Sequence, residues 1–496
     1  MLWPSQLYTV AQCRTLDARA IASGVSAYSL MGRAGLSALN LLLRQWALPS
    51  HIHVLCGVGN NGGDGLVLAK LAQQRKLAVT VYLCGDRSKL TAESAQALAD
   101  AEQAGVRITP FKRSESLSAG VIVDALLGIG IRGELREEVA TAIAWVNQSN
   151  LPILSLDVPS GLCADSGCLL GGAVIADKTL SFIAAKRGLF TGEGANVSGH
   201  VLLDNLDLPP SLFTDVGETI AHPMFHQLLA HLPRRPRNAH KGLFGHVLII
   251  GGDYGMAGAV MMAAEAAARV GAGLISVATQ PEHISALLAR MPEVMAHGVV
   301  SGQELDPLLD KPSVIVVGPG LGQTPWSEQM LQKVLTRKRP LVLDADALNL
   351  LSKMHVVDKP KRENWVLTPH PGEAARLLRS STDSVNQDRF KAVCDLQNRF
   401  GGTVVLKGAG SLIRTTNNTH LCSYGNPGMA SGGMGDLLSG IIAGLLAQHL
   451  PAEQAVPLAV SLHAKAADKA TEKVGEHGLL ASDLLTPMRY LLNGKH

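Results

Sequence analysis

Short apolar strands alternate with amphipathic helices along this chain, and that alternation limits its fold more than any other sequence feature. In the first half, strands are expected at 52–58, 78–84, 120–124 and 152–157. Helical patterns lie between them, for example at 66–75 and 134–148. Strands separated by helices form βαβ units, in which parallel strands share one sheet and helices cover both faces. The sequence therefore predicts an α/β fold with three layers.

The alternation stops in a proline-rich segment and then starts again. Five prolines fall within residues 205–242, where no strand is expected. Further apolar strands are expected at 245–252, 275–279, 313–318, 340–346, 365–369 and 403–408. A long apolar helix follows at 435–450. We therefore predict two α/β domains in tandem, residues 1–215 and 225–492, with a linker between them.

Charge and cysteine content argue against several classes of function. The 496 residues carry 44 Lys and Arg against 41 Asp and Glu. The chain therefore lacks the excess of positive charge that is typical of proteins that bind nucleic acid or an anionic membrane. The seven cysteines include no CxxC pair, which argues against a disulfide framework or a zinc site. The stretch that comes nearest to a membrane span, 257–278, is interrupted by Glu265 and Arg269. These features predict a soluble, cytoplasmic protein.

Polar residues follow three strands of the first domain. The strand at 52–58 runs into a turn from Gly59 to Asp64 that is rich in glycine and asparagine. The strand at 120–124 ends in Asp124, and the strand at 152–157 ends in Asp157, shortly before Ser160. Ligands of open α/β sheets bind beyond the carboxyl ends of the strands. We therefore expect these residues to meet at one edge of the sheet.

The chemistry available to this group is limited. The turn 59–64 is neither GxGxxG nor a Walker motif, but N–H groups ahead of a helix can still hold a phosphate. Asn61, Asp124 and Ser160 offer hard oxygen ligands suited to a cation, and Asp157 can serve as a general acid or base. The alternative is that these side chains only cap turns and helices. Three acids, each beside a glycine turn, favour the functional interpretation.

Three stretches of the first domain resemble the YjeF N-terminal family. They are VGNNGGDGLVLA, DALLGIGIRGE and LDVPSGLCADSG, in that order, and the resemblance covers residues 1–215. It implies a Rossmann-like three-layer sandwich with NAD(P)H-hydrate epimerase activity. It also implies that Asp157 binds substrate and is the acid/base, and that potassium is held by Asn61, Asp124 and Ser160. The other residues implied to bind the hydrate are Asn60, Asn61, Gly62, Gly63, Asp64, Gly128, Ile129, Gly130, Ile131, Arg132, Gly133 and Glu134.

A glycine-led helix is the clearest functional signal in the second domain. Gly432, Gly433 and Gly435 precede an apolar helix with Asp436 in its first turn. Backbone N–H groups and the positive end of the helix make an anion hole there. Aspartate is also a favourable first-turn charge without any function. Further glycine turns follow strands at 251–264, 317–323 and 406–413, and HPGE places His370 and Glu373 at another strand end. His370 on its own is as consistent with a structural role as with a ligand contact.

These motifs resemble the ribokinase superfamily, in particular its YjeF C-terminal branch, over residues 225–490. The kinases of the superfamily carry Asn-x-x-Glu near magnesium, whereas this chain has His370 in place of the asparagine and keeps Glu373. The resemblance therefore implies a ribokinase-like NAD(P)H-hydrate dehydratase that uses Mg²⁺ and ADP, with Asp436 as the base. Contacts to the hydrate are implied for Ala259, Gly322, His370 and Asp436. Contacts to ADP or AMP are implied for Lys407, Gly408, Ala409, Gly410, Ser411 and Gly435.

Together the two resemblances predict a repair enzyme for hydrated NADH and NADPH. The epimerase would interconvert the R and S hydrates, and the dehydratase would return the S hydrate to NAD(P)H while ADP becomes AMP and phosphate. The expected partners are the hydrates NADHX and NADPHX, ADP, and further copies of the chain in a homo-oligomer. One alternative is a vitamin or sugar kinase fused to a nucleotide-binding module. Another is that the first domain only binds nucleotides, and the choice between ADP and ATP stays open.

Overall fold

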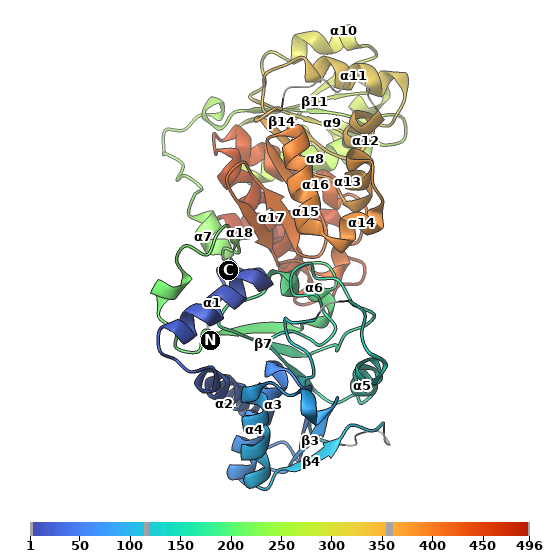
Figure 1. Ribbon diagram of the computed structural model, residues 1–496. Coiled ribbons are helices and arrows are strands. Elements are labelled where there is room, and N and C mark those ends of the chain that lie inside the picture. Colours follow the sequence, from blue (N-terminus) through green and yellow to red (C-terminus); the bar gives the residue numbers. More distant parts are fainter. Residues whose placement is uncertain (1–2, 114–116, 118, 132, 354–360, 495–496) are drawn as a thin grey trace. The chain divides into compact units, whose positions relative to one another are not determined.

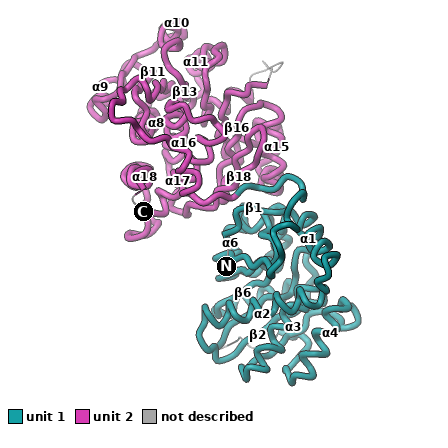
Figure 2. Tube along the Cα trace, turned by 90° about the vertical axis from the view of Figure 1, so that its left-hand side faces the viewer, with its two compact units in different colours: residues 1–221 teal, residues 222–496 magenta. Residues whose placement is uncertain are grey.

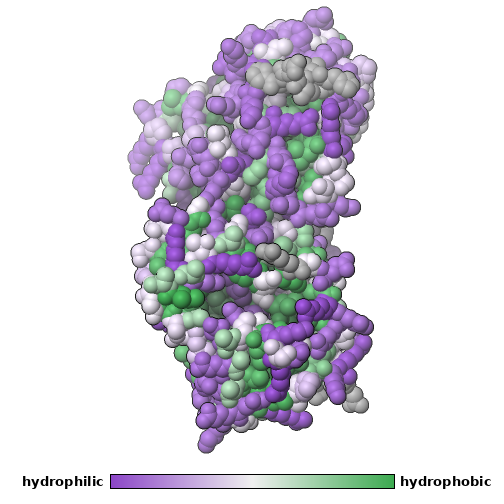
Figure 3. Space-filling view, in the orientation of Figure 1, coloured by the Kyte–Doolittle hydropathy of each residue, from purple (hydrophilic) through white to green (hydrophobic). Residues whose placement is uncertain are grey.

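The computed structural model describes residues 3–113, 117, 119–131, 133–353 and 361–494. These form two compact units, which meet in the chain between Ala221 and His222, within the proline-rich segment (Figure 2). Each unit is an α/β domain with its own sheet and its own core. In the view of Figure 3, hydrophilic side chains cover much of the visible surface of both units. Among the described helices, none has the length and apolar character needed to cross a membrane.

Strands β2 to β8 of the first unit build a parallel sheet in the order β4-β3-β2-β5-β6-β7-β8. The strands are β2 (Ile52–Cys56), β3 (Val79–Leu83), β4 (Arg107–Pro110), β5 (Val121–Ala125), β6 (Ile153–Leu156), β7 (Lys178–Phe182) and β8 (His200–Asp204). From β2 the chain proceeds outward through β3 and β4, then returns to pair β5 with the other side of β2. The strand order therefore reverses between β2 and β5, the point at which such sheets bind ligands.

Helices cover both faces of this sheet, which makes the three layers expected from the sequence (Figure 1). Val54 and Cys56 of β2 belong to the core beneath α2 (Ala27–Gln45), α3 (Asn60–Gln74) and α4 (Ala92–Gln103). Leu55 points the other way, into the core beneath α5 (Glu137–Asn147). Because successive strand residues face opposite sides, a strand covered on both faces is buried at every position and is mostly apolar. That is why the β2 run IHVLC carries no solvent-facing alternation.

The first helix, α1 (Val10–Ala22), is joined to the end of its own unit. Strand β1 (Gln6–Leu7), just before it, pairs antiparallel with β9 (Ile220–Ala221). The guanidinium group of Arg19 donates hydrogen bonds to the carbonyls of Leu212, Thr214 and Asp215. Thr9 caps the helix by accepting a hydrogen bond from the N–H of Gln12. The two ends of the unit are therefore held together by backbone pairing and by side chains.

The described strands of the second unit follow the order β18-β17-β16-β15-β14-β13-β10-β11-β12. They are β10 (His246–Ile250), β11 (Leu274–Thr279), β12 (Met295–Gly298), β13 (Val314–Val317), β14 (Leu341–Leu343), β15 (Trp365–Leu367), β16 (Thr403–Leu406), β17 (Ser411–Arg414) and β18 (Thr419–Cys422). The strands from β12 to β16 pair in parallel, and β16, β17 and β18 are antiparallel. The six strands expected here are confirmed, whereas β12, β17 and β18 were not expected.

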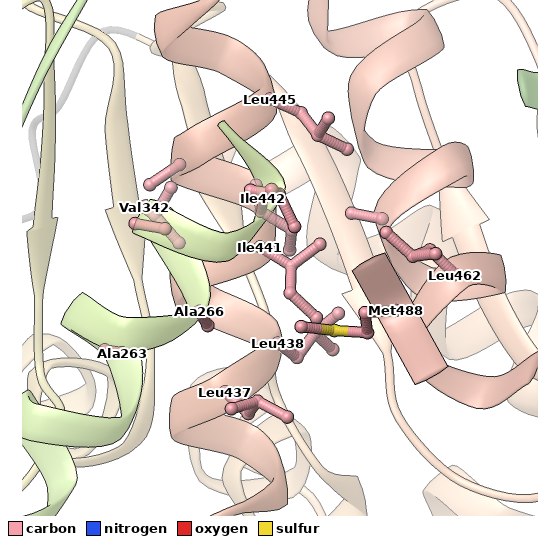
Figure 4. Close-up of a cluster of buried hydrophobic side chains, with 14 of the residues drawn as sticks. Ala263, Ala266, Val342, Leu437, Leu438, Ile441, Ile442, Leu445, Leu462 and Met488 are labelled. Carbon is pink, nitrogen blue, oxygen red and sulfur yellow. The ribbon is translucent and has the colours of Figure 1, made fainter. Parts of the chain in front are cut away.

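Two closely packed helices form the centre of the second core. The segment 257–278 is a buried helix followed by a strand, as expected: α8 (Ala257–Val270) leads into β11. Against α8 lies α16 (Met434–Ala447), whose leucines and isoleucines point into the core shared with α17 (Ala452–Thr471) and α18 (Leu485–Leu492) (Figure 4). A Cβ atom on Gly440 would come within 2.1 Å of the carbonyl oxygen of Ala263. Glycine is thus required there because the two helix backbones touch.

Candidate functional sites

A pocket of about 950 Å³ opens where the strand order of the first unit reverses. Its walls come from the start of α3, the loop after β5, the end of β6 and helix α1. The residues implied to bind the hydrate that line it are Asn60, Asn61, Asp64, Gly128, Ile129, Gly130, Ile131, Glu134 and Asp157. Gly62, Gly63 and Gly133 are not among its lining residues, and Arg132 lies outside the described residues.

The segment 60–64 is the first turn of α3, not the loop that its glycines and asparagines suggested. Gly62 and Gly63 lie on the buried side of this turn. A Cβ on Gly62 would lie 1.9 Å from the carbonyl oxygen of Gly57. A Cβ on Gly63 would lie 2.4 Å from the side chain of Met31. These two glycines let α3 begin directly on the end of β2, so they serve packing and leave Asn60, Asn61 and Asp64 facing the pocket.

The three side chains expected to hold potassium meet beside the backbone of Leu127. Asn61 Nδ2 donates a 2.9 Å hydrogen bond to the carbonyl of Leu127, and the N–H of Leu127 donates a 2.9 Å hydrogen bond to Ser160 Oγ. Ser160 Oγ in turn donates to Asp124 Oδ1, while Asp124 Oδ2 accepts from Ser155 and from the Ser160 N–H. Asp124 is fully buried, and burial raises its pKa although these hydrogen bonds oppose the rise. Asn61 Oδ1 is buried without a hydrogen-bond partner.

That orphaned oxygen is the observation that makes a cation fit. Buried polar atoms almost always have a partner, so an unpaired amide oxygen marks a place where an unseen ligand belongs. The surrounding donors are amide, hydroxyl, carboxylate and carbonyl oxygens, which suit a hard cation. The arrangement of Asn61, Asp124 and Ser160 therefore matches the chemistry of an alkali-metal site.

Asp157 is held in an unusual backbone conformation at the end of β6. Its φ of 65° lies in the left-handed region, which non-glycine residues adopt mainly where the surroundings impose it. Asp157 N donates to the Leu180 carbonyl, and Asp157 Oδ1 accepts a 3.2 Å hydrogen bond from the N–H of Phe182. The same oxygen accepts a short hydrogen bond from the ammonium group of Lys186, so strand β7 and the residues after it fix the carboxylate from two sides.

Lys186 is a functional candidate that the sequence did not reveal. Its side chain is buried, and its Nζ also donates to the Phe182 carbonyl at 2.9 Å and to Ser181 Oγ at 3.3 Å. Burial by itself would lower the pKa of Lys186, but Asp157, Cys13 and the other nearby acids outweigh burial, so the pKa is raised. Another lysine of this segment, Lys178, begins β7 at the opposite end of the strand from the pocket.

Two more acids face this pair. Asp64 of α3 and Asp17 of α1 line the same pocket, and burial is the largest cause that raises the pKa of each. Repulsion from Asp157 adds to the rise in both, and Lys186 opposes it. Asp17 was missed because helix α1 has no motif and precedes the motif-bearing segments by about forty residues.

In the second unit, buried charges gather at the carboxyl ends of β14, β15 and β16. Asp344 follows β14, and its Oδ1 accepts a 2.9 Å hydrogen bond from the ammonium group of Lys407. Its Oδ2 accepts a 2.7 Å hydrogen bond from Ser439 of α16. Glu373 lies 4.0 Å from the same ammonium group. Asp344 and Ser439 were given no role from the sequence, because nothing local connects a strand end with a helix residue 95 positions away.

Asp436 stands at the centre of this charge cluster. Gly433, with φ of 88°, precedes α16 in the left-handed conformation, and Asp436 follows in the first turn of the helix. Burial and then repulsion from Asp344 raise the pKa of Asp436 to about 7, while Lys407 pulls it down. A carboxyl with that pKa is poised to accept a proton near neutral pH. The geometry therefore suits a general base beside the amide groups at the start of a helix.

His370 and Glu373 also have a structural role. His370 is the N-cap of α13 (Pro371–Leu378): its Nδ1 accepts a hydrogen bond from Gly372 N, and its own N–H donates to Glu373 at 2.8 Å. Burial lowers the pKa of His370, and burial raises that of Glu373 to about 7. The imidazole remains half exposed. The helix cap explains the structural role of His370. Its predicted contact with a ligand stays a prediction.

The other expected ligand residues of the second unit lie on neighbouring loops. Gly322 follows β13, and its N–H donates a 2.9 Å hydrogen bond to Asp346. Ala259 lies in the first turn of α8, close to the backbone of Gly320. A Cβ added to Gly320 would lie 3.0 Å from the Cβ of Ala259. The loop 407–411 follows β16, and buried Arg389 donates hydrogen bonds to the carbonyls of Leu406 and Lys407. All of these loops leave the carboxyl edge of the sheet.

Comparison with known proteins covers both units of the chain. Residues 247–489 match the family model of the NAD(P)H-hydrate dehydratase, and residues 27–188 match that of the YjeF-related protein N-terminus. The bifunctional NAD(P)H-hydrate repair enzyme Nnr of Coxiella burnetii is 49% identical, over 98% of this chain and 99% of the relative. The chain belongs to the family of bifunctional NAD(P)H-hydrate repair enzymes. The resemblances seen in the sequence are thereby confirmed.

Other repair enzymes and a solved dehydratase are similar as well. The Escherichia coli repair enzyme Nnr is 42% identical, over 95% of this chain and 90% of its own length. An ADP/ATP-dependent NAD(P)H-hydrate dehydratase from Bacillus subtilis, crystallised with ATP and Mg²⁺, is 31% identical with a TM-score of 0.50. It covers 55% of this chain and 98% of the solved one. A ribokinase-like superfamily protein from Enterococcus faecalis matches with 31% identity and a TM-score of 0.51, over 55% of this chain and 95% of its own.

Proposed function

We propose that this chain repairs hydrated NADH and NADPH with two activities. The first unit interconverts the R and S hydrates, and the second unit converts the S hydrate to NAD(P)H while ADP is converted to AMP and phosphate. The observation that carries the proposal is Asp436, a carboxyl poised near neutral pH at the glycine-led start of α16. It occurs in a chain that matches bifunctional repair enzymes from end to end.

In the second unit, Asp436 removes the proton of the ring hydroxyl of the hydrate. The hydroxyl oxygen then takes the terminal phosphoryl group of ADP, which leaves AMP. The N–H groups of Gly433, Met434 and Gly435 face the charge that develops on the phosphoryl oxygens. Phosphate departs with the electron pair of its C–O bond as the ring nitrogen forms a C=N bond, and loss of a proton from the adjacent carbon restores NAD(P)H.

A metal ion fits beside this base. Among the described residues, no three His, Cys, Asp or Glu side chains gather into a protein-only metal site. Mg²⁺ is commonly bound by one or two carboxylates together with substrate phosphates, and Glu373, beside Lys407, can provide such a carboxylate. Mg²⁺ bound there would neutralise phosphate charge. Lys407, held by Asp344, adds a fixed positive charge on the protein side.

In the first unit, Asp157 is the acid/base for epimerisation. Potassium would be held by Asn61, Asp124 and Ser160, and it would supply a fixed positive charge next to the loop 127–131. The orphaned oxygen of Asn61 supports this assignment. We also infer a homo-oligomer located in the cytoplasm; none of the seven cysteines, all of which lie in the described part of the chain, is in a disulfide, as a reducing compartment favours.

The test is to incubate the protein with a mixture of R and S NADPH hydrate, Mg²⁺ and K⁺, adding ADP or ATP, and to follow absorbance of the reduced nicotinamide. Complete recovery with ADP is expected. Asp157→Asn should stop recovery at the S fraction, and Asp436→Asn should prevent recovery altogether. Recovery that stops at the S fraction in the unaltered protein would reduce the first unit to a binding module. Nucleotide consumption that requires an added alcohol instead of hydrate would favour the kinase alternative.

A further inference from the structure

Lys186 is the feature of the first unit that the proposed mechanism leaves unused. A buried ammonium group is costly unless it is paired, so its retention beside the acid/base calls for an explanation. Its three hydrogen bonds divide into two kinds. The Phe182 carbonyl and Ser181 Oγ hold the ammonium group in place, and the third bond goes to Asp157 Oδ1.

Two carboxyls that line the pocket with this lysine, those of Asp157 and Asp64, have different hydrogen-bond partners. Asp157 receives the ammonium group and the N–H of Phe182 on one oxygen, so two donors stabilise its ionised form. Within the part of the chain that the structure describes, only burial and neighbouring charges act on the Asp64 carboxyl, and no hydrogen bond to it is found, although it lines the same pocket. Burial and the charge of Asp157 favour its protonated form. The fold therefore favours the carboxylate form of Asp157 and the neutral acid form of Asp64.

Epimerisation of the hydrate needs two such groups. The hydroxyl leaves one face of the ring as water when an acid protonates it, and its C–O electron pair departs while the ring nitrogen forms a C=N bond. Water then adds to the opposite face, and a base takes the proton that water releases. Each turnover therefore moves one proton from the acid to the base, and the reverse reaction or exchange with solvent returns it. Pairs of carboxyls whose environments differ are the usual means of providing both roles.

We propose that Lys186 is a positioning residue that makes the two pocket carboxyls unequal, with Asp157 held as the ionised base and Asp64 kept as the proton donor. The inference rests on the proposed epimerase function. Other titratable groups face the pair as well: Cys13 and Asp17 from α1, with Arg14 and Asp165 near them. Asp17 adds negative charge that further raises the pKa of Asp64.

The experiment measures R–S interconversion in the full-length protein without nucleotide, by chromatographic separation of the epimers as a function of pH. In Lys186→Met, Asp157 loses its ammonium partner, so the acid limb of the profile should move up by about one to two pH units. Its kcat should fall while KM stays within about threefold. Lys186→Arg should restore most of the original profile because it restores the charge. Lys178→Met, at the other end of β7, is the matched control and should behave like the unaltered protein.

Two further variants keep the test decisive. Asp64→Asn should lose kcat with little change in KM, because an amide cannot give up a proton to the leaving hydroxyl. Lys186→Met combined with Asp157→Asn removes the buried pair together, and it should be no slower than Asp157→Asn alone, even if Lys186→Met by itself folds poorly. Dehydration of purified S hydrate with ADP, a reaction of the second unit, normalises the amount of active protein in each preparation, and a melting curve reports whether the first unit is folded.

The outcomes separate two failures. If the unaltered protein does not interconvert the epimers, the proposed epimerase function is wrong. If it does, and Lys186→Met keeps both its pH profile and its kcat, the positioning role of Lys186 is wrong. Normal turnover in Asp64→Asn would likewise overturn the assignment of the proton donor.

Discussion

The pKa of Asp436 can be tested by removing the charge of its neighbour. Asp344→Asn keeps the shape of the side chain and can keep a hydrogen bond with Ser439, but it removes the negative charge that raises the pKa of Asp436. Lys407, which lowers that pKa, is then opposed only by burial and by the weaker repulsion from Asp346. The base works when ionised, so dehydration fails as pH falls through the pKa of Asp436. In the variant, the acid limb of dehydration should therefore move to lower pH.

The size of the shift follows from simple electrostatics. A unit charge at roughly 8 Å, in an effective dielectric of about 20 to 40, is worth about 1–2 kcal/mol, or about one pKa unit. The assay is the initial rate of dehydration of purified S hydrate at saturating ADP, measured across pH. An acid limb near pH 7, set by the pKa of about 7, should move down by about one unit.

The opposite variant provides the control. Lys407→Met removes the positive charge, so the limb should move up instead, at ADP concentrations raised to compensate for any loss of nucleotide binding. Both changes break a buried ion pair, which typically costs about 3–5 kcal/mol of stability, so melting temperatures must show that each variant is folded during the assay. Shifts in the same direction, or no shift in either folded variant, would refute the assignment of Asp436 as the titrating base.

Three further predictions concern stability and ion binding. The folded-state pKa of Asp436, about 7, lies above its value of 3.8 in the unfolded chain, so stability is lost as pH rises from about 4 to about 7 and changes little above that. Asp436→Asn should therefore stabilise the protein more at pH 8 than at pH 5, by about 1–2 kcal/mol, as urea unfolding can measure. Gly440→Ala should destabilise the second unit by about 3 kcal/mol, because the new methyl group meets the carbonyl of Ala263, whereas Gly258→Ala on the facing helix, where a Cβ meets nothing within 4 Å, should not lower the melting temperature. Asn61→Ala should raise the K⁺ concentration needed for half-maximal epimerisation by about tenfold or more and leave dehydration unchanged; an unaltered K⁺ response would remove Asn61 from the ion site.

The parts of the fold that could be predicted from sequence are those whose burial leaves a continuous apolar signature. The central parallel strands are buried on both faces, so runs such as HVLII at β10 stand out. The short strand MAHG at β12 and the β17–β18 hairpin carry no such run and were missed. The start of α3 was misplaced because glycine and asparagine usually signal a turn, and here packing against β2 overrides that preference.

The candidate sites divide in the same way. Residues at the ends of buried strands, such as Asp124 and Asp157, could be predicted because topology alone brings parallel strand ends together. Lys186, Asp17 and Asp344 act through partners in space that no spacing in the chain reveals. Their contributions become visible only when the directions of the side chains are known.

The family model of the first unit covers residues 27–188, yet Cys13, Asp17 and Ile21 of α1 form one wall of the pocket, and Leu206 contributes from beyond the other end. Helix α1 is in turn tied through Arg19 to residues 212–215, and β1 to β9. Anyone who divides this protein to study the epimerase separately must therefore begin before β1 and cut no earlier than residue 221. A fragment limited to the matched segment would keep the motif residues and lose the wall of the pocket that α1 provides.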